Sequence, residues 1–241
     1  MSTVLLLRHG RTASNASGVL AGWTPGIGLD EVGVAQAQAV SARLSALPLA
    51  AIVASPLERC RQTAGAVADG RPVEPATDER LGEARYGDWT GRALKDLAKE
   101  PLWKVVQAHP SAAVFPGADP EGVAGEGLAA MQARAVEAVR EWNARLGPDA
   151  VWLACSHGDV IKGIVADALG LHLDQFQRIS VDPCSITAIR YTELRPFVLR
   201  VNDTGGGVEG LVPPAPRKGR KRKPPSSDAA VGGGAGPAGS G

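Results

Sequence analysis

Short runs of consecutive apolar residues recur along the chain, and each ends in a polar loop. Residues 3–7, 51–54 and 150–155 are runs of this kind. Unbroken apolar runs of this length are typical of strands that are buried on both faces of a parallel sheet. Two later segments, 186–191 and 197–201, alternate apolar and polar residues. This alternation predicts an antiparallel hairpin that turns at residues 193–196.

Helical periodicity separates these strands. The apolar face predicted for a first helix, which starts near Asp30, consists of Val32, Ala35, Ala39, Val40, Leu44 and Leu47. A second helix of about five turns carries the stripe Leu128, Met131, Ala135, Val139, Trp142 and Leu146. A third contains Ile161, Ile164, Val165 and Ala168, and Gly170 is placed to stop it. Strands that alternate with helices predict an α/β fold: a three-layer α/β/α sandwich with a mostly parallel sheet and an antiparallel C-terminal edge hairpin.

Two segments depart from this scheme. Residues 87–125 are broken by four prolines into short helical pieces, which predicts a small helical cap insertion. After residue 203 the chain becomes rich in glycine and proline and cannot bury a core. We therefore expect one domain over residues 1–203 and a disordered, basic tail over residues 204–241.

The charge is divided unevenly between the body and the tail. The tail has six Lys or Arg residues against two acids, or +4, so the net charge of +1 leaves −3 on the body. A mildly acidic body is not built to coat nucleic acid. The basic run at 217–223 could contact nucleic acid weakly, but a solvated extension is the preferred interpretation.

The chain also lacks the patterns of membrane, secreted and metal-binding proteins. It has no apolar run of the ~18 residues that span a membrane, and no signal segment precedes Arg8. Cys60, Cys155 and Cys184 are far apart in apolar surroundings, which predicts buried thiols, not disulfides or zinc ligands. We expect a cytoplasmic protein with no metal and no cofactor.

Unusual polar residues follow each of the three buried strands, at the edge of the sheet where parallel strands place their ligands. The three loops contribute Arg8, His9, Arg11 and Asn15, then Ser55, Arg59 and Arg61, and then Ser156, His157 and Gly158. Two histidines and at least two arginines therefore converge. A cationic pocket of this kind suits a planar or tetrahedral oxyanion, and phosphate is the usual one.

The motifs that carry these residues resemble those of the histidine phosphatase superfamily, also called the phosphoglycerate-mutase-like family. Leu-Arg-His-Gly at 7–10, with Asn15, is similar to the family's opening motif. Ser-Pro-Leu-Glu-Arg at 55–59, followed by Gln-Thr-Ala at 62–64, resembles the second. Leu-Gly-Glu at 81–83 resembles the segment that carries the acid, and Ser-His-Gly at 156–158 the last motif. The resemblance covers roughly residues 1–203.

The resemblance implies a two-step phosphoryl transfer through a phosphohistidine at His9. Glu83 would protonate the leaving oxygen and then activate water, although Glu79 and Asp88 lie close to it in the sequence. The groups implied to hold the phosphate oxygens are Arg8, Asn15, Arg59 and His157. Nearby guanidinium charges should keep His9 neutral, and Glu83 should have a raised pKa. The implied partner is a small phosphorylated metabolite.

The family contains phosphatases and mutases, so the motifs alone leave the reaction open. Only 74 residues separate Glu83 from His157, which is short beside the cofactor-dependent mutases of the family. Residues 156–161 look more like the phosphatase branch, and the body resembles an actinobacterial phosphomutase-like subgroup. We prefer a metal-independent phosphatase of small phosphate monoesters. The alternatives are a cofactor-dependent phosphomutase and a phospho-ligand binding module without turnover.

Overall fold

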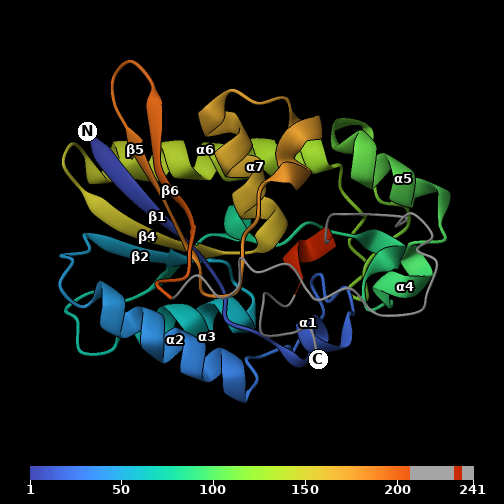
Figure 1. The fold of residues 1–241 in the computed structure, drawn as a ribbon, viewed down its shortest axis with the longest axis horizontal. Helices are drawn as coiled ribbons and strands as arrows, with labels where there is room; N and C mark the ends of the chain where they lie inside the picture. Colours follow the sequence, from blue (N-terminus) through green and yellow to red (C-terminus); the bar gives the residue numbers. More distant parts are fainter. Residues whose placement is uncertain (207–230, 235–241) are drawn as a thin grey trace, which may run out of the picture.

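The computed structural model describes residues 1–206 and 231–234. Within these residues, six strands form one sheet in the order β3-β2-β4-β1-β5-β6 (Figure 1). The strands are β1 Ser2–Arg8, β2 Ala51–Ala54, β3 Ala76–Thr77, β4 Val151–Ser156, β5 Ile186–Tyr191 and β6 Pro196–Asp203. Strands β1 to β4 run parallel, while β5 is antiparallel to both β1 and β6. The mostly parallel sheet and its antiparallel edge hairpin are confirmed; the two-residue β3 was not predicted.

Helices cover both faces of this sheet and make it the middle of three layers, as predicted. Helices α2 and α3 lie on one face, and α6 and α7 lie on the other (Figure 1). The α-helices are α1 Ala13–Ser17, α2 Glu31–Leu44, α3 Glu58–Ala68, α4 Leu94–Leu97, α5 Pro101–Ala108, α6 Leu128–Leu146 and α7 Gly158–Leu169. The 3-10 helices are η1 Glu79–Leu81, η2 Gly87–Trp89, η3 Pro110–Ala112, η4 Leu173–Arg178 and η6 Val231–Gly233.

The unbroken apolar runs are explained by two separate cores. On β1, Val4 and Leu6 belong to the core shared with α6 and α7. Their neighbours Leu5 and Leu7 belong to the core shared with α2 and α3. Successive side chains of a strand point to opposite faces, so a strand between two cores needs apolar residues at every position.

The buried face of α2 differs from the predicted one. Val40 and Leu44 are buried as expected, but Val32 and Leu47 are 37% and 38% exposed. The helix instead buries Gly33, Ala37, Val40 and Leu44. Its first turn packs directly on the loop after β1: a Cβ at Gly33 would overlap the Arg11 carbonyl oxygen. This close approach sets the rotation of the helix, and apolar periodicity carries no signal for it.

The positions of all three predicted helices along the chain agree with the structure. Asp30 caps α2 by accepting a hydrogen bond from the Gly33 amide at 2.8 Å. Helix α6 buries Leu128, Met131 and Val139 of the predicted stripe. Helix α7 is capped by Gly170 in the left-handed conformation, with φ 66°.

The segment between residues 87 and 125 consists of short helices joined by turns. Its large aromatic side chains Trp89, Trp103 and Phe115 are buried; Trp89 packs T-shaped against Phe115 and at a tilt against Trp103. Phe115 also packs against Tyr86, with ring centroids 4.9 Å apart. These aromatics therefore hold the segment to the body.

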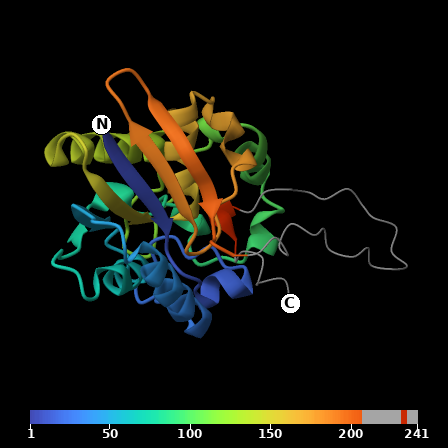
Figure 2. The ribbon, with the colours of Figure 1, turned by 60° about the vertical axis from the view of Figure 1, so that its left-hand side comes forward.

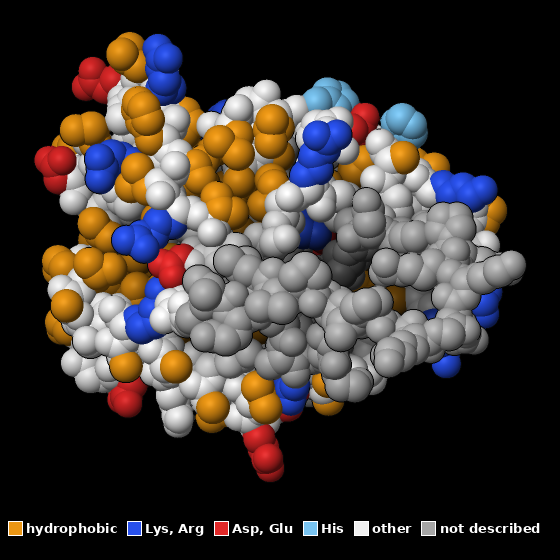
Figure 3. Space-filling model, viewed as in Figure 1, with side chains coloured by type: hydrophobic (Ala, Val, Ile, Leu, Met, Phe, Trp, Pro, Cys, Tyr) orange, Lys and Arg blue, Asp and Glu red, His pale blue; other side chains and the backbone are white. Residues whose placement is uncertain are grey.

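The three cysteines are buried with free thiols. Among the described residues, no helix has the length and apolar character needed to cross a membrane. On the face shown in Figure 3, the described charged side chains of both signs are interspersed with apolar ones. The basic run predicted at 217–223 lies outside the described residues. Figure 2 shows a described part of the tail, around η6, beside the C-terminal end of β6.

Candidate active site

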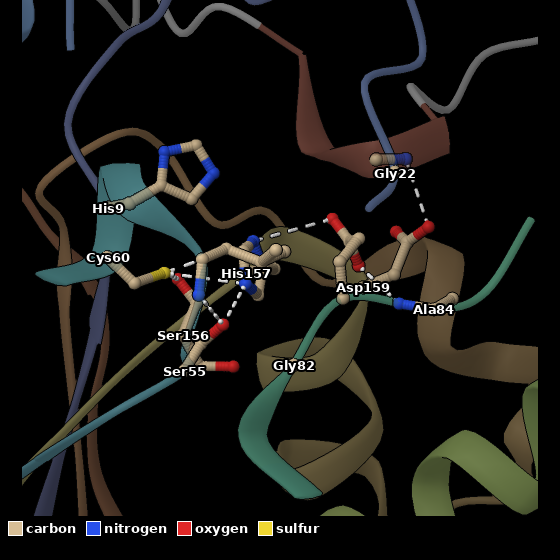
Figure 4. A network of polar contacts seen from close by, with 12 residues as sticks. His9, Gly22, Ser55, Cys60, Gly82, Ala84, Ser156, His157 and Asp159 are labelled. Carbon is tan, nitrogen blue, oxygen red and sulfur yellow. Dashed lines mark hydrogen bonds and ion pairs between the residues drawn. The ribbon is translucent and has the colours of Figure 1, made fainter. Parts of the chain in front are cut away.

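The loops that follow β1, β2 and β4 meet at one edge of the sheet. Arg8 at the end of β1 pairs with Ser156 at the end of β4, and Ala54 of β2 pairs with Cys155. His9, Ser55 and His157 are the next residues along these strands, so they are brought together (Figure 4). A cleft opens above them, lined by His9, Asn15, Arg59 and Glu83, with residues 18–22, Tyr86 and Leu94 forming further walls.

His9 is held in one orientation and is 2% exposed. Its Nδ1 lies 2.7 Å from the Gly10 carbonyl oxygen, and a carbonyl can only accept. Nδ1 therefore carries the proton, and the Nε2 lone pair is available. Burial, followed by the charges of Arg59 and Arg8, holds the pKa of His9 well below its ordinary 6.5. The ring is therefore neutral near pH 7.

His157 is fixed from both ring nitrogens. Its Nε2 lies 2.8 Å from Ser55 Oγ, and Arg59 Nη2 lies 3.3 Å from its Nδ1. The sulfur of Cys60 lies 3.4 Å from Nε2 (Figure 4). Burial and the Arg59 charge hold the pKa of His157 well below 6.5. The Ser55 hydroxyl can donate or accept, so it serves either neutral tautomer.

Arg59 presents a donor that nothing in the described structure satisfies. The side chain is buried, and its Nη2 donates to the Gly22 carbonyl at 2.9 Å. Its Nη1 is buried without a hydrogen-bond partner among the described residues. A buried guanidinium donor left unpaired costs free energy, which an anionic ligand in the cleft would remove. Arg8 is also buried, and its Nη1 donates to the Val181 carbonyl at 2.8 Å.

Glu83 is 4% exposed and anchored through its own backbone. Trp23 Nε1 and Arg134 Nη2 both donate to its carbonyl, at 2.6 and 3.0 Å. Its Oε2 lies 3.8 Å from Nδ1 of His157. Burial and then the negative charge of Asp159 raise the pKa of Glu83 to about 7. Glu79 and Asp88, the other nearby acids in the sequence, are exposed and do not line the cleft.

A buried polar network supports Glu83 and was not predicted. Asp159 on α7 accepts a hydrogen bond from the Tyr86 hydroxyl at 3.0 Å and one from Lys162 at 3.3 Å. All three side chains are buried. The available signal was an acid and a lysine spaced i, i+3 in an otherwise apolar helix, a spacing that puts both on one face.

Asn15 lines the opposite wall of the cleft through the capping of α1. Its Oδ1 accepts a hydrogen bond from the backbone N–H of Thr12, at 3.1 Å, while Thr12 caps the helix. This use of the oxygen leaves the Asn15 amide group as a donor.

Thr63 links the loop after β1 to α3, because its hydroxyl accepts a hydrogen bond from the Gly10 amide at 3.0 Å and donates one to the Arg59 carbonyl at 2.7 Å.

The structure therefore brings His9, Asn15, Arg59 and Glu83 around one cleft, while Arg8 and His157 are fully buried and do not line it. Arg11 is turned away and forms an ion pair with Asp30 at 2.8 Å. Among the described residues, no three His, Cys, Asp or Glu side chains are grouped as metal ligands. The arrangement offers a neutral imidazole at His9, two buried guanidinium groups at Arg8 and Arg59, and a carboxyl group at Glu83 whose pKa is about 7.

Comparisons with known proteins find relatives over most of the chain. The family model of the histidine phosphatase superfamily (branch 1) matches residues 4–204. The probable phosphoglycerate mutase GpmB of Yersinia enterocolitica is 30% identical over 194 residues, which cover 80% of this chain and 86% of that protein.

Solved structures show the same fold. YhfR of Bacillus stearothermophilus superposes with a TM-score of 0.75 at 29% identity, over 84% of this chain and 98% of that one. A mycobacterial glucosyl-3-phosphoglycerate phosphatase in complex with VO3 gives a TM-score of 0.71 at 26% identity, over 83% and 98%. The alpha-ribazole phosphatase of Shigella flexneri gives 0.72 at 25% identity, over 86% and 99%.

Proposed function

Because this chain belongs to the histidine phosphatase superfamily, we propose that it hydrolyses small phosphate monoesters through a phosphohistidine at His9, without a metal. The observation that carries the proposal is the pairing of two groups in one buried cleft. His9 has its Nε2 lone pair directed by the Nδ1 contact to Gly10. Arg59 has a buried donor that lacks a partner among the described residues.

The first step breaks the ester bond. His9 Nε2 attacks phosphorus in line with the leaving oxygen, forming the N–P bond as the O–P bond breaks. Arg8, Arg59 and His157 hold the equatorial oxygens, and Asn15 donates a further hydrogen bond. Phosphoryl transfer requires mainly positioning and charge stabilisation, which two guanidinium groups supply in a desolvated site.

Glu83 supplies the proton that the leaving oxygen takes. A carboxyl group with a pKa of about 7 is still about half protonated at neutral pH, so it can act as an acid. In the second step the ionised Glu83 removes a proton from water, whose oxygen attacks phosphorus and releases His9. The cycle consumes one ester and one water, yields one alcohol and one phosphate, and restores both residues.

The walls of the cleft favour an ester whose leaving group is uncharged. Apart from Arg59 and Glu83, the described lining of the cleft carries no charged side chain and includes uncharged residues such as Ser14, Val19, Leu20 and Leu94. The nearby basic side chains are already paired, among them Arg85 with Asp119 and Arg92 with Glu100, each at 2.6 Å. A carboxylated substrate would need a second cation, and the described lining offers none.

The second candidate is a cofactor-dependent phosphomutase, which the 30% identity to the probable phosphoglycerate mutase of Yersinia enterocolitica favours. A mutase of this kind needs a bisphosphate to charge its histidine, and transfer must exceed hydrolysis. The lining beyond the clamp argues against phosphoglycerate as the substrate. The test is isomerisation of a phosphoglycerate with 2,3-bisphosphoglycerate added or withheld.

Phosphate release from an aryl phosphate, measured with a chelator present and no bisphosphate, tests the proposal. We expect release by the unmodified chain and its loss in His9→Ala. The matched control is His109→Ala, which removes a 72% exposed imidazole outside the cleft and should leave the rate unchanged. Full activity in His9→Ala would overturn the proposal. Binding of phosphate without release by the unmodified chain would favour a binding module instead.

A further inference from the structure

A short piece of the C-terminal tail lies in the mouth of the cleft. The superfamily match ends at residue 204, yet residues 231–234 pack against the site. The carbonyl oxygens of Gly232 and Gly234 accept hydrogen bonds from Arg8 Nη2 at 3.2 and 2.6 Å. The Gly232 amide donates to Asp159 Oδ2 at 2.9 Å. Figure 4 shows this part of the ribbon above His9 and Gly22.

The side chain that precedes these glycines is anchored in the core. Val231 is 2% exposed and belongs to the same apolar cluster as Leu20 and Tyr86. Gly232 has a φ of +71°, and a Cβ there would approach Leu20 to 3.1 Å. The cleft thus accepts one aliphatic side chain followed by a glycine. Other residues rarely adopt this positive φ, and their Cβ would crowd Leu20.

The docked segment leaves little room in the cleft. The remaining cavity has a volume of about 30 Å³. Val231, Gly232 and Gly234 line that cavity together with His9, Arg59 and Glu83, so the segment occupies part of the space in which a phosphate ester would bind. The donor that would hold a phosphate oxygen, Arg8 Nη2, is meanwhile occupied by two main-chain carbonyls.

We propose that Arg8 and Asp159 form a main-chain-binding subsite whose ligand is the chain's own segment Val231–Gly234, and that this segment competes with the phosphate ester. The part of Arg8 in holding phosphate rests on the proposed function. A phosphate oxygen makes a stronger, charge-assisted hydrogen bond with a guanidinium group than a glycine carbonyl does, so substrate displaces the segment. The apparent dissociation constant then equals the intrinsic constant divided by the undocked fraction, because only the undocked chain binds substrate.

The test uses full-length chains that differ at one position. Val231→Asp places a charge where the segment is buried, and Gly232→Pro removes the donor to Asp159 and forbids the observed φ. The matched control is Val212→Asp, the same substitution elsewhere in the tail. We expect both segment variants to bind inorganic phosphate on the order of tenfold more tightly than the unmodified chain, measured by calorimetry. The control should equal the unmodified chain.

Two further readouts separate this proposal from the proposed function. KM for an aryl phosphate should fall in parallel with the dissociation constant for inorganic phosphate in the segment variants, while kcat stays unchanged. Hydrogen exchange of the Gly232 amide should be slow in the free protein and fast when phosphate is bound. Tighter phosphate binding by the segment variants, without turnover by any chain, would support the main-chain-binding subsite and refute the proposed phosphatase activity. Equal phosphate affinity in all four chains, or no binding by any of them, would overturn the competition.

Discussion

Ser55 Oγ lies 2.8 Å from Nε2 of His157, and the two residues come from the ends of adjacent parallel strands. Ser55 is itself fixed, because its backbone N–H donates to the Cys155 carbonyl at 2.9 Å. The serine therefore orients the imidazole without reaching the cleft. When phosphate occupies the cleft, the Ser55 hydroxyl can donate to Nε2 and leave the Nδ1 proton for a phosphate oxygen.

Replacing Ser55 by alanine should loosen the His157 ring without removing it. We expect kcat/KM of Ser55→Ala to fall by about ten- to a hundredfold, because small misplacements of a positioned group cost that much. Ser55→Thr keeps the hydroxyl and should recover most of the loss. Steady-state kinetics of the two variants check this prediction, and equal loss in both would show that Ser55 acts only through packing.

The pH dependence of kcat/KM should be set by Glu83. Its pKa of about 7 means that the acid form is lost as pH rises through neutrality. His9, whose pKa is held well below 6.5, stays neutral on the acid side. We expect kcat/KM to be flat at mildly acid pH and to fall about tenfold per unit at alkaline pH.

In Glu83→Gln this alkaline fall should disappear, and kcat/KM should be lower by about 10²–10⁴-fold. The loss should be greater for an alkyl phosphate than for an aryl phosphate, because an aryl oxide leaves without a proton. Glu79→Gln, which alters an exposed acid four residues away, is the control and should keep the wild-type profile. An unchanged alkaline limb in Glu83→Gln would contradict the assignment of the acid.

Asp159 should tune the proton on Glu83 from outside the cleft. Its negative charge raises the pKa of Glu83, so removing that charge must lower this pKa. In Asp159→Asn the alkaline limb of kcat/KM should shift to lower pH by about one unit. Asp167→Asn, which changes an acid of the same helix paired with Arg140 at the surface, should not move the limb. A loss of rate at every pH with no shift would indicate a purely structural role.

Much of the cleft was predictable because parallel strands place their ends at one sheet edge. Arg8, His9 and His157 follow apolar runs directly, so their convergence needed no knowledge of side-chain contacts. The Tyr86–Asp159 hydrogen bond joins residues 73 positions apart, and no strand end brings them together. Its existence depends on how α7 packs beneath the loop that carries Glu83.

Two other features were outside the reach of hydrophobic patterning. The rotation of α2 follows from a glycine packed on backbone, and a pattern of apolar positions treats glycine as neutral. The docking of Val231 occurs in a glycine-rich stretch that was expected to have no fixed structure. A single valine gives no hydrophobic periodicity along the sequence. Only the folded structure shows that Val231 packs in an apolar cluster with Leu20 and Tyr86.

The contact between α2 and the His9 loop should be intolerant of a side chain. A Cβ at Gly33 would overlap the Arg11 carbonyl, whereas one at Gly65 in α3 meets no atom within 4 Å. Gly33→Ala should lower the free energy of unfolding by about 1–3 kcal/mol. Gly65→Ala should raise it by about 0.5–1 kcal/mol, through helix propensity. Urea denaturation measures both changes; equal stability of the two variants would contradict the packing described.

Trapping the covalent intermediate tests the central claim most directly. In Glu83→Gln the water step lacks its base, so an aryl phosphate should charge His9 faster than water discharges it. Rapid quenching at alkaline pH, followed by peptide mass spectrometry, should find one phosphoryl group on His9, labile to acid and absent from His9→Ala. Turnover of the aryl phosphate with no adduct on His9, or with the adduct on another residue, would contradict the account.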